Sequence, residues 1–320
     1  MFFHMPARLY FGSGEIENLG TIVIDQLKAK HPVLVTDKGI VQSGLLEKVT
    51  GQLPGIRVYD RIEANPKSDT VNAVAADLRQ QGADLVIGLG GGSPLDAGKA
   101  LALLGTNAGN IEDYEGKSKY KNRPLPFLAI PTTCGTGSEV TWVSVITDVK
   151  RKFKMSIKGP EMYPMVSIVD PDLIKTLPPP IVAATGLDAL THAVEAYLSK
   201  PATIITDTHA RKAVQLILGS VEPAYRDIQN NHQARENLMF GSTVAGLAFG
   251  NSDVTAVHCI SESIGALYDI PHGVANAVFL PHVLLYNVDH CTAKLAALAR
   301  AAGMDEPDDN RAGRTFIQAV

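Results

Sequence analysis

Side chains of the kinds that bind a catalytic divalent metal recur at helical spacing in the second half of the chain. Asp188 and His192 lie four residues apart, and so do His258 and Glu262. Residues four apart share one face of a helix. A loop in the following segment D-I-P-H-G is expected to deliver His272. Carboxylate and imidazole ligands are typical of a catalytic Zn²⁺ or Fe²⁺ site rather than of a closed thiolate site.

The setting of Asp188 and His192 favours a joint role over separate ones. Leu187, Leu190 and Val194 flank them, so their helix is expected to be largely buried. Burying a carboxylate and an imidazole is costly unless they are paired or bind a metal. Taken singly, such an acid usually caps or pairs, and such a histidine is usually structural. The histidines without this spacing are interpreted as structural or solvated: His4, His31, His209, His232, His282 and His290.

A glycine-rich turn in the first half is a candidate phosphate-binding site. Three consecutive glycines follow the apolar segment 83–89 and precede a predicted helix: Gly90, Gly91 and Gly92. Uncovered backbone N–H groups at the start of a helix suit a pyrophosphate. Ser93 is expected to be the N-cap, with Pro94 at the first helical position. The glycine spacing matches neither a P-loop nor G-x-G-x-x-G, and a tight turn without a ligand fits the residues equally well.

Two further features extend this candidate nucleotide site. Asp37 ends the predicted strand 32–36, where an acid can bind a ribose 2′-hydroxyl and repel the 2′-phosphate of NADP; a turn-forming Asp is the alternative. The loop 131–141 follows the predicted strand 127–130, at the strand end where open α/β sheets bind ligands. Its hydroxyl groups can contact a nicotinamide. Cys134 in this loop is not interpreted as a nucleophile, since no paired base is evident.

The elements that must position these residues divide the chain in two. Short apolar runs alternate with helical patterns before residue 180: strands 32–36, 56–59, 83–89, 127–130 and 166–169, with helices 70–81 and 94–104. This alternation predicts a parallel α/β sheet. After L-P-P-P at 177–180 only helical patterns follow: 181–199, 203–220, 232–249, 253–267, 274–286 and 291–302. We therefore expect an α/β dinucleotide-binding domain over residues 1–180 and an all-α metal-binding domain over residues 181–320.

Composition and charge exclude several classes of protein. The chain is 45% hydrophobic and 19% charged, as in an ordinary globular protein, and its net charge is −4. Lys and Arg are scattered, so no nucleic-acid partner is expected. No apolar run is long enough to span a membrane, and the start lacks the features of a signal peptide. Three cysteines, without a C-x-x-C pair, favour a reducing cytoplasm over a disulfide framework.

Several longer motifs resemble a known family. They are G-G-G-S-P-L-D-A-G-K at 90–99, P-T-T-C-G-T-G-S-E-V-T at 131–141, G-L-D-A-L-T-H-A-V-E-A-Y at 186–197 and P-H-G-V-A-N-A at 271–277. The opening F-F-H-M-P-A-R-L-Y-F-G-S-G belongs to the same set. Over nearly its whole length the chain resembles the iron-containing (group III) alcohol dehydrogenases. The resemblance implies a dinucleotide-binding α/β domain followed by a helical metal-binding domain.

The resemblance also implies roles for individual residues. The implied metal ligands are Asp188, His192, His258 and His272, and ligand type permits either Fe²⁺ or Zn²⁺. The pyrophosphate would be held by Gly90, Gly91, Gly92 and Ser93, and Asp37 would select NAD. The remaining candidates for cofactor binding are Asp96, Thr132, Thr133, Thr141 and Lys154. His258 and Glu262 are the catalytic candidates, although many family members carry a histidine in place of Glu262.

The expected reaction is the NAD-dependent interconversion of a primary alcohol, or a small diol, and its aldehyde. The resemblance further implies a homodimer or larger assembly. Alternatives are a dehydrogenase or reductase for a hydroxy acid or maleylacetate, and a metal-dependent lyase of the dehydroquinate synthase type. A non-catalytic remnant is the third, because family members usually run longer and the chain is expected to be truncated within the helical domain. The dispersed pocket residues do not fix the alcohol or aldehyde.

Overall fold

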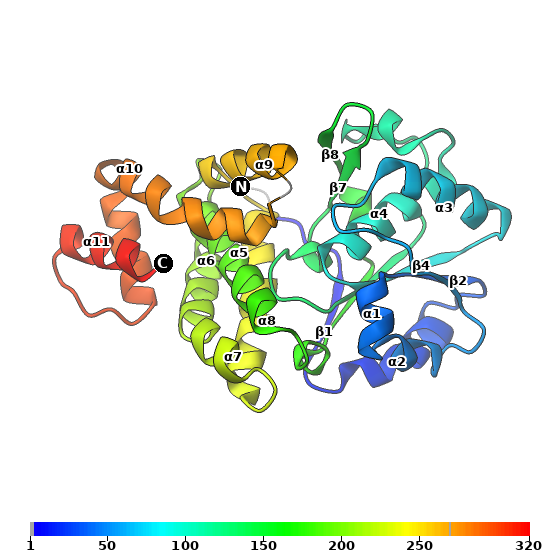
Figure 1. The fold of residues 1–320 in the computed structure, drawn as a ribbon, viewed down its shortest axis with the longest axis horizontal. Helices are drawn as coiled ribbons and strands as arrows, with labels where there is room; N and C mark the ends of the chain where they lie inside the picture. Colours follow the sequence, from blue (N-terminus) through cyan, green and yellow to red (C-terminus); the bar gives the residue numbers. More distant parts are fainter. Residues whose placement is uncertain (1–2, 269) are drawn as a thin grey trace. The chain divides into compact units, whose positions relative to one another are not determined.

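The computed structural model describes residues 3–268 and 270–320, and its chain forms two compact units (Figure 1). The first, here the α/β unit, comprises residues 5–132 and 138–173. The second, the helical unit, comprises the chain up to residue 4, residues 133–137 and residues 174–320. Among the described residues, no helix combines the length and apolar character needed to cross a membrane.

Six parallel strands form the main sheet of the α/β unit, in the order β1-β9-β6-β4-β2-β3. They are β1 (Arg8–Phe11), β2 (Pro32–Val35), β3 (Arg57–Tyr59), β4 (Leu85–Gly90), β6 (Phe127–Pro131) and β9 (Val166–Val169). β4 lies between β2 and β6, with Val35 opposite Gly88 and Gly90 opposite Pro131. Every residue of β4 and β6 is buried, as expected for strands covered on both faces.

Helices cover both faces of this sheet. They are α1 (Lys38–Ser43), α2 (Leu46–Thr50), α3 (Ser68–Gln80) and α4 (Gly92–Thr106). Short 3₁₀ segments are η1 (Glu15–Asn18), η3 (Ile111–Tyr114), η4 (Ser138–Val140), η5 (Pro160–Met162) and η6 (Pro171–Ile174), and η2 (Thr21–Gln26) is a π-helix. Val33 and Val35 of β2 join the core beside α3 and α4, while Leu34 joins the core beside η1, η2, α1 and α2. Successive side chains of a strand point to opposite faces, so β2 contributes side chains to the hydrophobic cores on both faces of the sheet.

A second sheet of three strands was not predicted from the sequence. Its order is β5-β8-β7, from β5 (Gly116–Lys117), β7 (Val143–Asp148) and β8 (Phe153–Lys158). β7 and β8 pair antiparallel, and buried and half-buried residues alternate along β7. This alternation of period two is what one covered face produces. The five predicted strands of the main sheet are confirmed, and β1 is an additional edge strand.

The helical unit contains helices and no strand within the residues that the structure describes. They are α5 (Pro179–Leu198), α6 (Ile204–Leu218), α7 (Val221–Asp227), α8 (His232–Phe249), α9 (Ala256–Tyr268), α10 (His272–Ala301) and α11 (Asp309–Ala319). α5 packs against α6, α8 and α10. The predicted helices 274–286 and 291–302 correspond to the two parts of α10, which meet at a kink where Cys291 has non-helical backbone angles, φ −134° and ψ 20°. The predicted fold class, a parallel α/β part followed by an all-helical part, is confirmed.

Candidate metal centre and nucleotide-binding turn

Three helices of the helical unit bring the predicted metal ligands together. Asp188 and His192 lie one turn apart on α5, and both are buried. His258 is buried on α9, and the half-buried His272 is on α10. Ligand atoms of Asp188, His258 and His272 all lie within 4.8 Å of one another. The spacing seen in the sequence therefore corresponds to one cluster of side chains.

His272 opens a helix, and the prediction that a loop delivers it is wrong. Pro271 precedes it as the N-cap of α10, with φ −55° and ψ 129°, because the extended backbone of a proline is well suited to the residue before a helix. Gly273 then allows close packing on α5, since a Cβ there would lie 2.2 Å from the carbonyl oxygen of Ala184. This close approach places His272 Nε2 3.7 Å from Asp188 Oδ1.

His192 is held differently from the other three. Its Nδ1 lies 4.0 Å from Asp188 Oδ2, and its ring stacks on Phe249 with centroids 4.2 Å apart. The ring centroid of His258 is 4.4 Å away. Among the described residues, the buried Nδ1 of His192 has no hydrogen-bond partner. A buried nitrogen without a partner calls for an explanation, and an absent metal ion is one.

Glu195 was missed at the level of sequence. It lies on α5, seven residues after Asp188 and therefore on the same face, and it is buried. Its Oε2 is 2.5 Å from His258 Nδ1, and its Oε1 accepts a 2.7 Å bond from the Val257 backbone N–H. Thr255 Oγ1 also donates to Oε1. A carboxylate on Nδ1 fixes the ring so that Nε2 faces the cluster, an arrangement typical of metal-binding histidines.

Asn276 is the second residue that sequence reasoning missed. It follows His272 by one turn of α10 and is fully buried. Its Nδ2 donates to Asp188 Oδ1 at 2.6 Å and lies 3.2 Å from Nε2 of both His258 and His272. Ser261 Oγ donates to its Oδ1. The spacing of four from His272 is the feature by which the sequence could have identified it.

The protonation of these groups follows from burial and from one another. Burial by itself would raise the pKa of Asp188, but the neighbouring histidines and Asn276 bring it below its usual value. Burial lowers the pKa of His192 to about 3, so its ring is neutral near pH 7. Burial also opposes charge on His258, yet the bond to Glu195 and the charge of Asp188 raise its pKa overall. The lowered pKa values of Asp188 and Glu195 favour their charged forms beside His258, and His192 stays neutral. Asp188 and His192 could therefore bind a cation.

The residues present fit a divalent metal. Asp188, His258 and His272 offer one carboxylate and two imidazoles, donors typical of Fe²⁺ or Zn²⁺ in a catalytic site, whereas His192 is not part of this group of ligand atoms found in the described residues. A bound cation would supply the partner that the buried Nδ1 of His192 lacks within the part of the chain that the structure describes. Because a ligating imidazole must carry no proton on its metal-facing nitrogen, metal binding to His258 would release a proton.

Glu262 is exposed on α9, one turn after His258. Its charge contributes to the raised pKa of His258. It is not part of the cluster of ligand atoms found in the described residues. Its predicted catalytic role stays a prediction.

The glycine turn lies at the carboxyl end of β4 in the α/β unit. Gly91 is the N-cap and the helix α4 begins at Gly92, so the prediction that Ser93 caps the helix with Pro94 at its first position is wrong. Ser93 and Pro94 fall inside the first turn, where a missing N–H costs no helical bond. Gly90 has φ +149°, and a Cβ there would lie 2.6 Å from Pro94 Cγ. Only glycine fits this position.

Asp37 and Thr132 end the strands on either side of β4. Asp37 is the N-cap of α1, its Oδ1 accepting from the Ile40 N–H at 3.0 Å, a local structural role that neither interpretation from the sequence specified. Its Oδ2 remains beside the turn, 3.4 Å from where a Cβ of Gly90 would lie. The Thr132 N–H donates to the Gly90 carbonyl at 2.9 Å. The carboxyl ends of neighbouring parallel strands are where open α/β sheets bind ligands.

The other predicted cofactor residues lie in different places. Asp96 is on α4, with its two carboxylate oxygens bonded to Ser138 and Val145. Thr141 is buried after η4, and Lys154 is half-buried on β8. Thr133 belongs to the helical unit. Their contacts with a nucleotide stay predictions.

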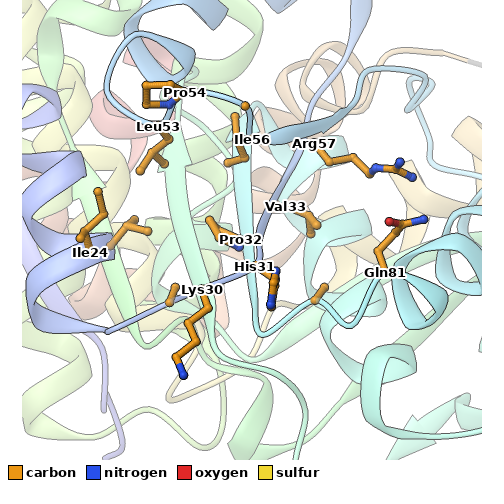
Figure 2. A pocket seen from close by; sticks show the side chains of 14 residues that line it. Ile24, Lys30, His31, Pro32, Val33, Leu53, Pro54, Ile56, Arg57 and Gln81 are labelled. Atoms are coloured by element: carbon orange, nitrogen blue, oxygen red, sulfur yellow. The ribbon is translucent and has the colours of Figure 1, made fainter.

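A cavity of about 400 Å³ lies at the amino ends of strands in the main sheet, at the end opposite to the glycine turn (Figure 2). Its lining includes Pro32 at the start of β2, Arg57 at the start of β3 and Ala83 just before β4. These are the amino ends of strands whose carboxyl ends carry Asp37 and the glycine turn. The cavity is therefore not part of the candidate nucleotide site.

Two family models and several known proteins match most of the chain. Residues 6–171 match the family model described as iron-containing alcohol dehydrogenase, and residues 182–320 match the model described as Fe-containing alcohol dehydrogenase family, C-terminal. Alcohol dehydrogenase 4 of Saccharomyces cerevisiae is 38% identical over 315 residues, which cover 96% of this chain and 82% of the relative. 1,3-Propanediol dehydrogenase of Klebsiella pneumoniae is 41% identical over 305 residues, covering 93% and 78%. The crystal structure of a 1,3-propanediol oxidoreductase superposes with a TM-score of 0.95 at 39% identity, covering 100% of this chain and 85% of that one.

Proposed function

The chain belongs to the iron-containing alcohol dehydrogenase family and is an oxidoreductase, and from this premise we propose that it interconverts a primary alcohol or small diol and its aldehyde with NAD. The observation that carries the proposal is the buried cluster of Asp188, His258 and His272. The names of the yeast and Klebsiella relatives support an alcohol or diol as the substrate class.

We propose that Asp188, His192, His258 and His272 hold Fe²⁺, with Zn²⁺ as the alternative that the same donors accept. When bound, the metal supplies Lewis acidity toward the alcohol oxygen and the nicotinamide supplies the hydride acceptor. Asp188 is the one negatively charged ligand of this set. A divalent metal bound there would therefore keep a net positive charge and stay electrophilic. Glu195 supports this set by fixing the ring of His258 through Nδ1.

Glu262 is proposed to accept the proton of the alcohol. Its carboxylate is exposed to solvent, and it lies on α9 one turn after His258. Ligation is the less favoured role, because four ligands already complete the donor set. His258, the second catalytic candidate, is proposed to act as a metal ligand, with Glu262 one helical turn away.

The α/β half of the chain, residues 1–180, is proposed to bind NAD, and the helical half, residues 181–320, to bind the metal. In the first half, the N–H groups of Gly91 and Gly92 with Ser93 are proposed to hold the pyrophosphate. Asp37 is proposed to bind the ribose through its Oδ2, which its capping bond leaves available. Further nucleotide contacts are proposed for Thr132, Thr133, Thr141 and Lys154.

The substrate class can be tested directly. The metal-free chain would be loaded with Fe²⁺ under anaerobic conditions and assayed for NADH formation with a panel of primary alcohols, small diols and hydroxy acids. We expect NADH to accumulate with an alcohol or diol in proportion to the aldehyde formed. A lyase would consume its substrate without accumulating NADH, and turnover of hydroxy acids alone would contradict the proposed substrate class.

The assembly and location are also proposals. We propose a homodimer or larger homo-oligomer in the cytoplasm, supported by the family resemblance and by three cysteines that form no disulfide among the described residues. Analytical ultracentrifugation of the purified chain would measure the oligomeric state, and a monomer would contradict the first part.

A further inference from the structure

Lys99 is a fully buried cation in the α/β unit that the proposed chemistry does not use. It lies on α4, which begins at the glycine turn, and its side chain is 0% exposed. Asp96 Oδ1 lies 4.0 Å from its Nζ, beyond hydrogen-bond distance. Burial lowers the pKa of Lys99 to about 8, with Asp96 and Glu139 opposing the shift. A buried ammonium is costly, so its presence here calls for a role.

The hydrogen bonds of Lys99 all run to one segment. Its Nζ donates to Ser138 Oγ at 2.8 Å, to the Val143 carbonyl at 2.8 Å and to Thr141 Oγ1 at 3.4 Å. Three acceptors match the three hydrogens of an ammonium group. Ser138 gives its own hydroxyl hydrogen to Asp96 Oδ1 at 2.7 Å, so its oxygen must accept from Lys99.

Asp96 ties the same segment to α4 from one turn earlier. Its Oδ2 accepts from the Val145 N–H at 3.0 Å, and its backbone carbonyl accepts from Ser144 Oγ at 2.7 Å. The two side chains thus hold residues 138–145, which comprise η4 and the start of β7, against the helix that follows the glycine turn. Thr141, a proposed nucleotide contact, lies within this segment.

We propose that Lys99 is a positioning residue for nucleotide binding, which holds the segment of Thr141 in register with the glycine turn through its bonds to Ser138, Thr141 and Val143. This inference rests on the proposed function, because it requires that both the turn and the segment contact NAD. Lys99 itself does not touch the nucleotide. It fixes the distance between two parts of the proposed site that are far apart in the sequence. Lys99 and Thr141 are separated by 42 residues.

The experiment measures the Kd for NADH by fluorescence in the full chain and its Lys99→Met and Ser138→Ala variants. Methionine keeps the length of the side chain and removes its charge and donors. We expect Lys99→Met to weaken NADH binding by about tenfold or more, and Ser138→Ala by about threefold, the sizes expected for lost charged and neutral hydrogen bonds. Metal content should stay at the wild-type level in both. Coupling between the two positions should make the double variant less than additive.

Leu101→Ala is the control, since Leu101 is buried on the same helix and belongs to its apolar core. It should lower the thermal stability as much as Lys99→Met does while leaving the Kd for NADH unchanged. Equal weakening of NADH binding by Leu101→Ala would overturn the positioning role. Wild-type affinity for NADH in Lys99→Met would also overturn it. If Lys99→Met does not fold, wild-type affinity for NADH in Ser138→Ala would do the same. A wild-type chain that binds no NADH would instead overturn the proposed nucleotide site and this inference with it.

Discussion

Replacing Glu195 by glutamine should weaken metal binding without removing a ligand. Glu195 is 2% exposed, and its two oxygens accept bonds from His258 Nδ1 and from the Val257 N–H. Glutamine has the same shape but only one acceptor oxygen, so its amide nitrogen must face one of these two donors. No rotation of the side chain satisfies both.

Each orientation has a cost that the structure allows us to estimate. If the amide nitrogen faces Val257, two donors meet in a buried site, a penalty of about 1–3 kcal/mol. If it faces His258, Nδ1 of that ring must become an acceptor, and the proton moves to Nε2, the nitrogen that would bind the metal. Loss of a partner of this kind typically costs 10–100-fold in metal affinity, or about 1.4–2.7 kcal/mol.

The assay is a chelator competition with Zn²⁺ near neutral pH, which needs no turnover. We expect the Kd for Zn²⁺ to rise about 10–100-fold in Glu195→Gln. Glu222→Gln is the matched control, because Glu222 forms an exposed ion pair with Arg226 on α7 and such pairs contribute about 1 kcal/mol or less. Wild-type affinity in Glu195→Gln would refute the reasoning that His258 binds the metal in the orientation set by Glu195.

Three other substitutions test separate parts of the account. Asp37→Asn keeps the cap on α1 and removes the charge, so the ratio of kcat/KM for NAD to that for NADP should fall; an unchanged ratio would exclude Asp37 as the selector. Because burial lowers the pKa of Lys99 from 10.5 to about 8, its contribution to stability is fully present above 10.5 and lost as the pH falls through 8. Relative to Lys99→Met, the wild type should therefore gain up to about 3 kcal/mol of unfolding free energy from pH 8 to 10.5 in urea titrations, and a flat difference would contradict this. Glu262→Gln should keep its metal, lower kcat and change the acid limb of the pH–rate profile; unchanged kinetics would make Glu262 a surface carboxylate.

The helical spacing in the sequence identified much of the metal cluster because spacing of four is a local property of a helix. Asp188 and His192 needed only α5 to share a face. Glu195 lies on the same helix, yet its role depends on His258, 63 residues later in the chain. Its spacing of seven from Asp188 indicates a shared face of the helix, but only the hydrogen bonds to Val257 and His258 of α9 reveal its partners.

The glycine turn shows a similar limit. Three glycines between a strand and a helix predicted the position of the turn, but not which residue begins the helix. Ser93 has the side chain of a good N-cap, yet Gly91 takes that place without any side-chain bond. The deciding contact is between Gly90 and Pro94, where a Cβ would clash. Likewise β7 alternates buried and half-buried residues, but its partner β8 pairs with it only through a turn that the composition did not reveal.

The central claim is that the side chains of α5, α9 and α10 hold the metal on which NAD reduction depends. The most direct measurement is NADH formation from a primary alcohol or diol by the metal-stripped chain before and after anaerobic addition of Fe²⁺, alongside His192→Ala. His192 is the decisive residue because its buried Nδ1 has no hydrogen-bond partner in residues 3–268 and 270–320, which the structure describes. We predict that Fe²⁺ restores NADH formation in the wild type and not in His192→Ala, while both bind NADH alike. Full NADH formation by the stripped chain, or by His192→Ala, would contradict the account.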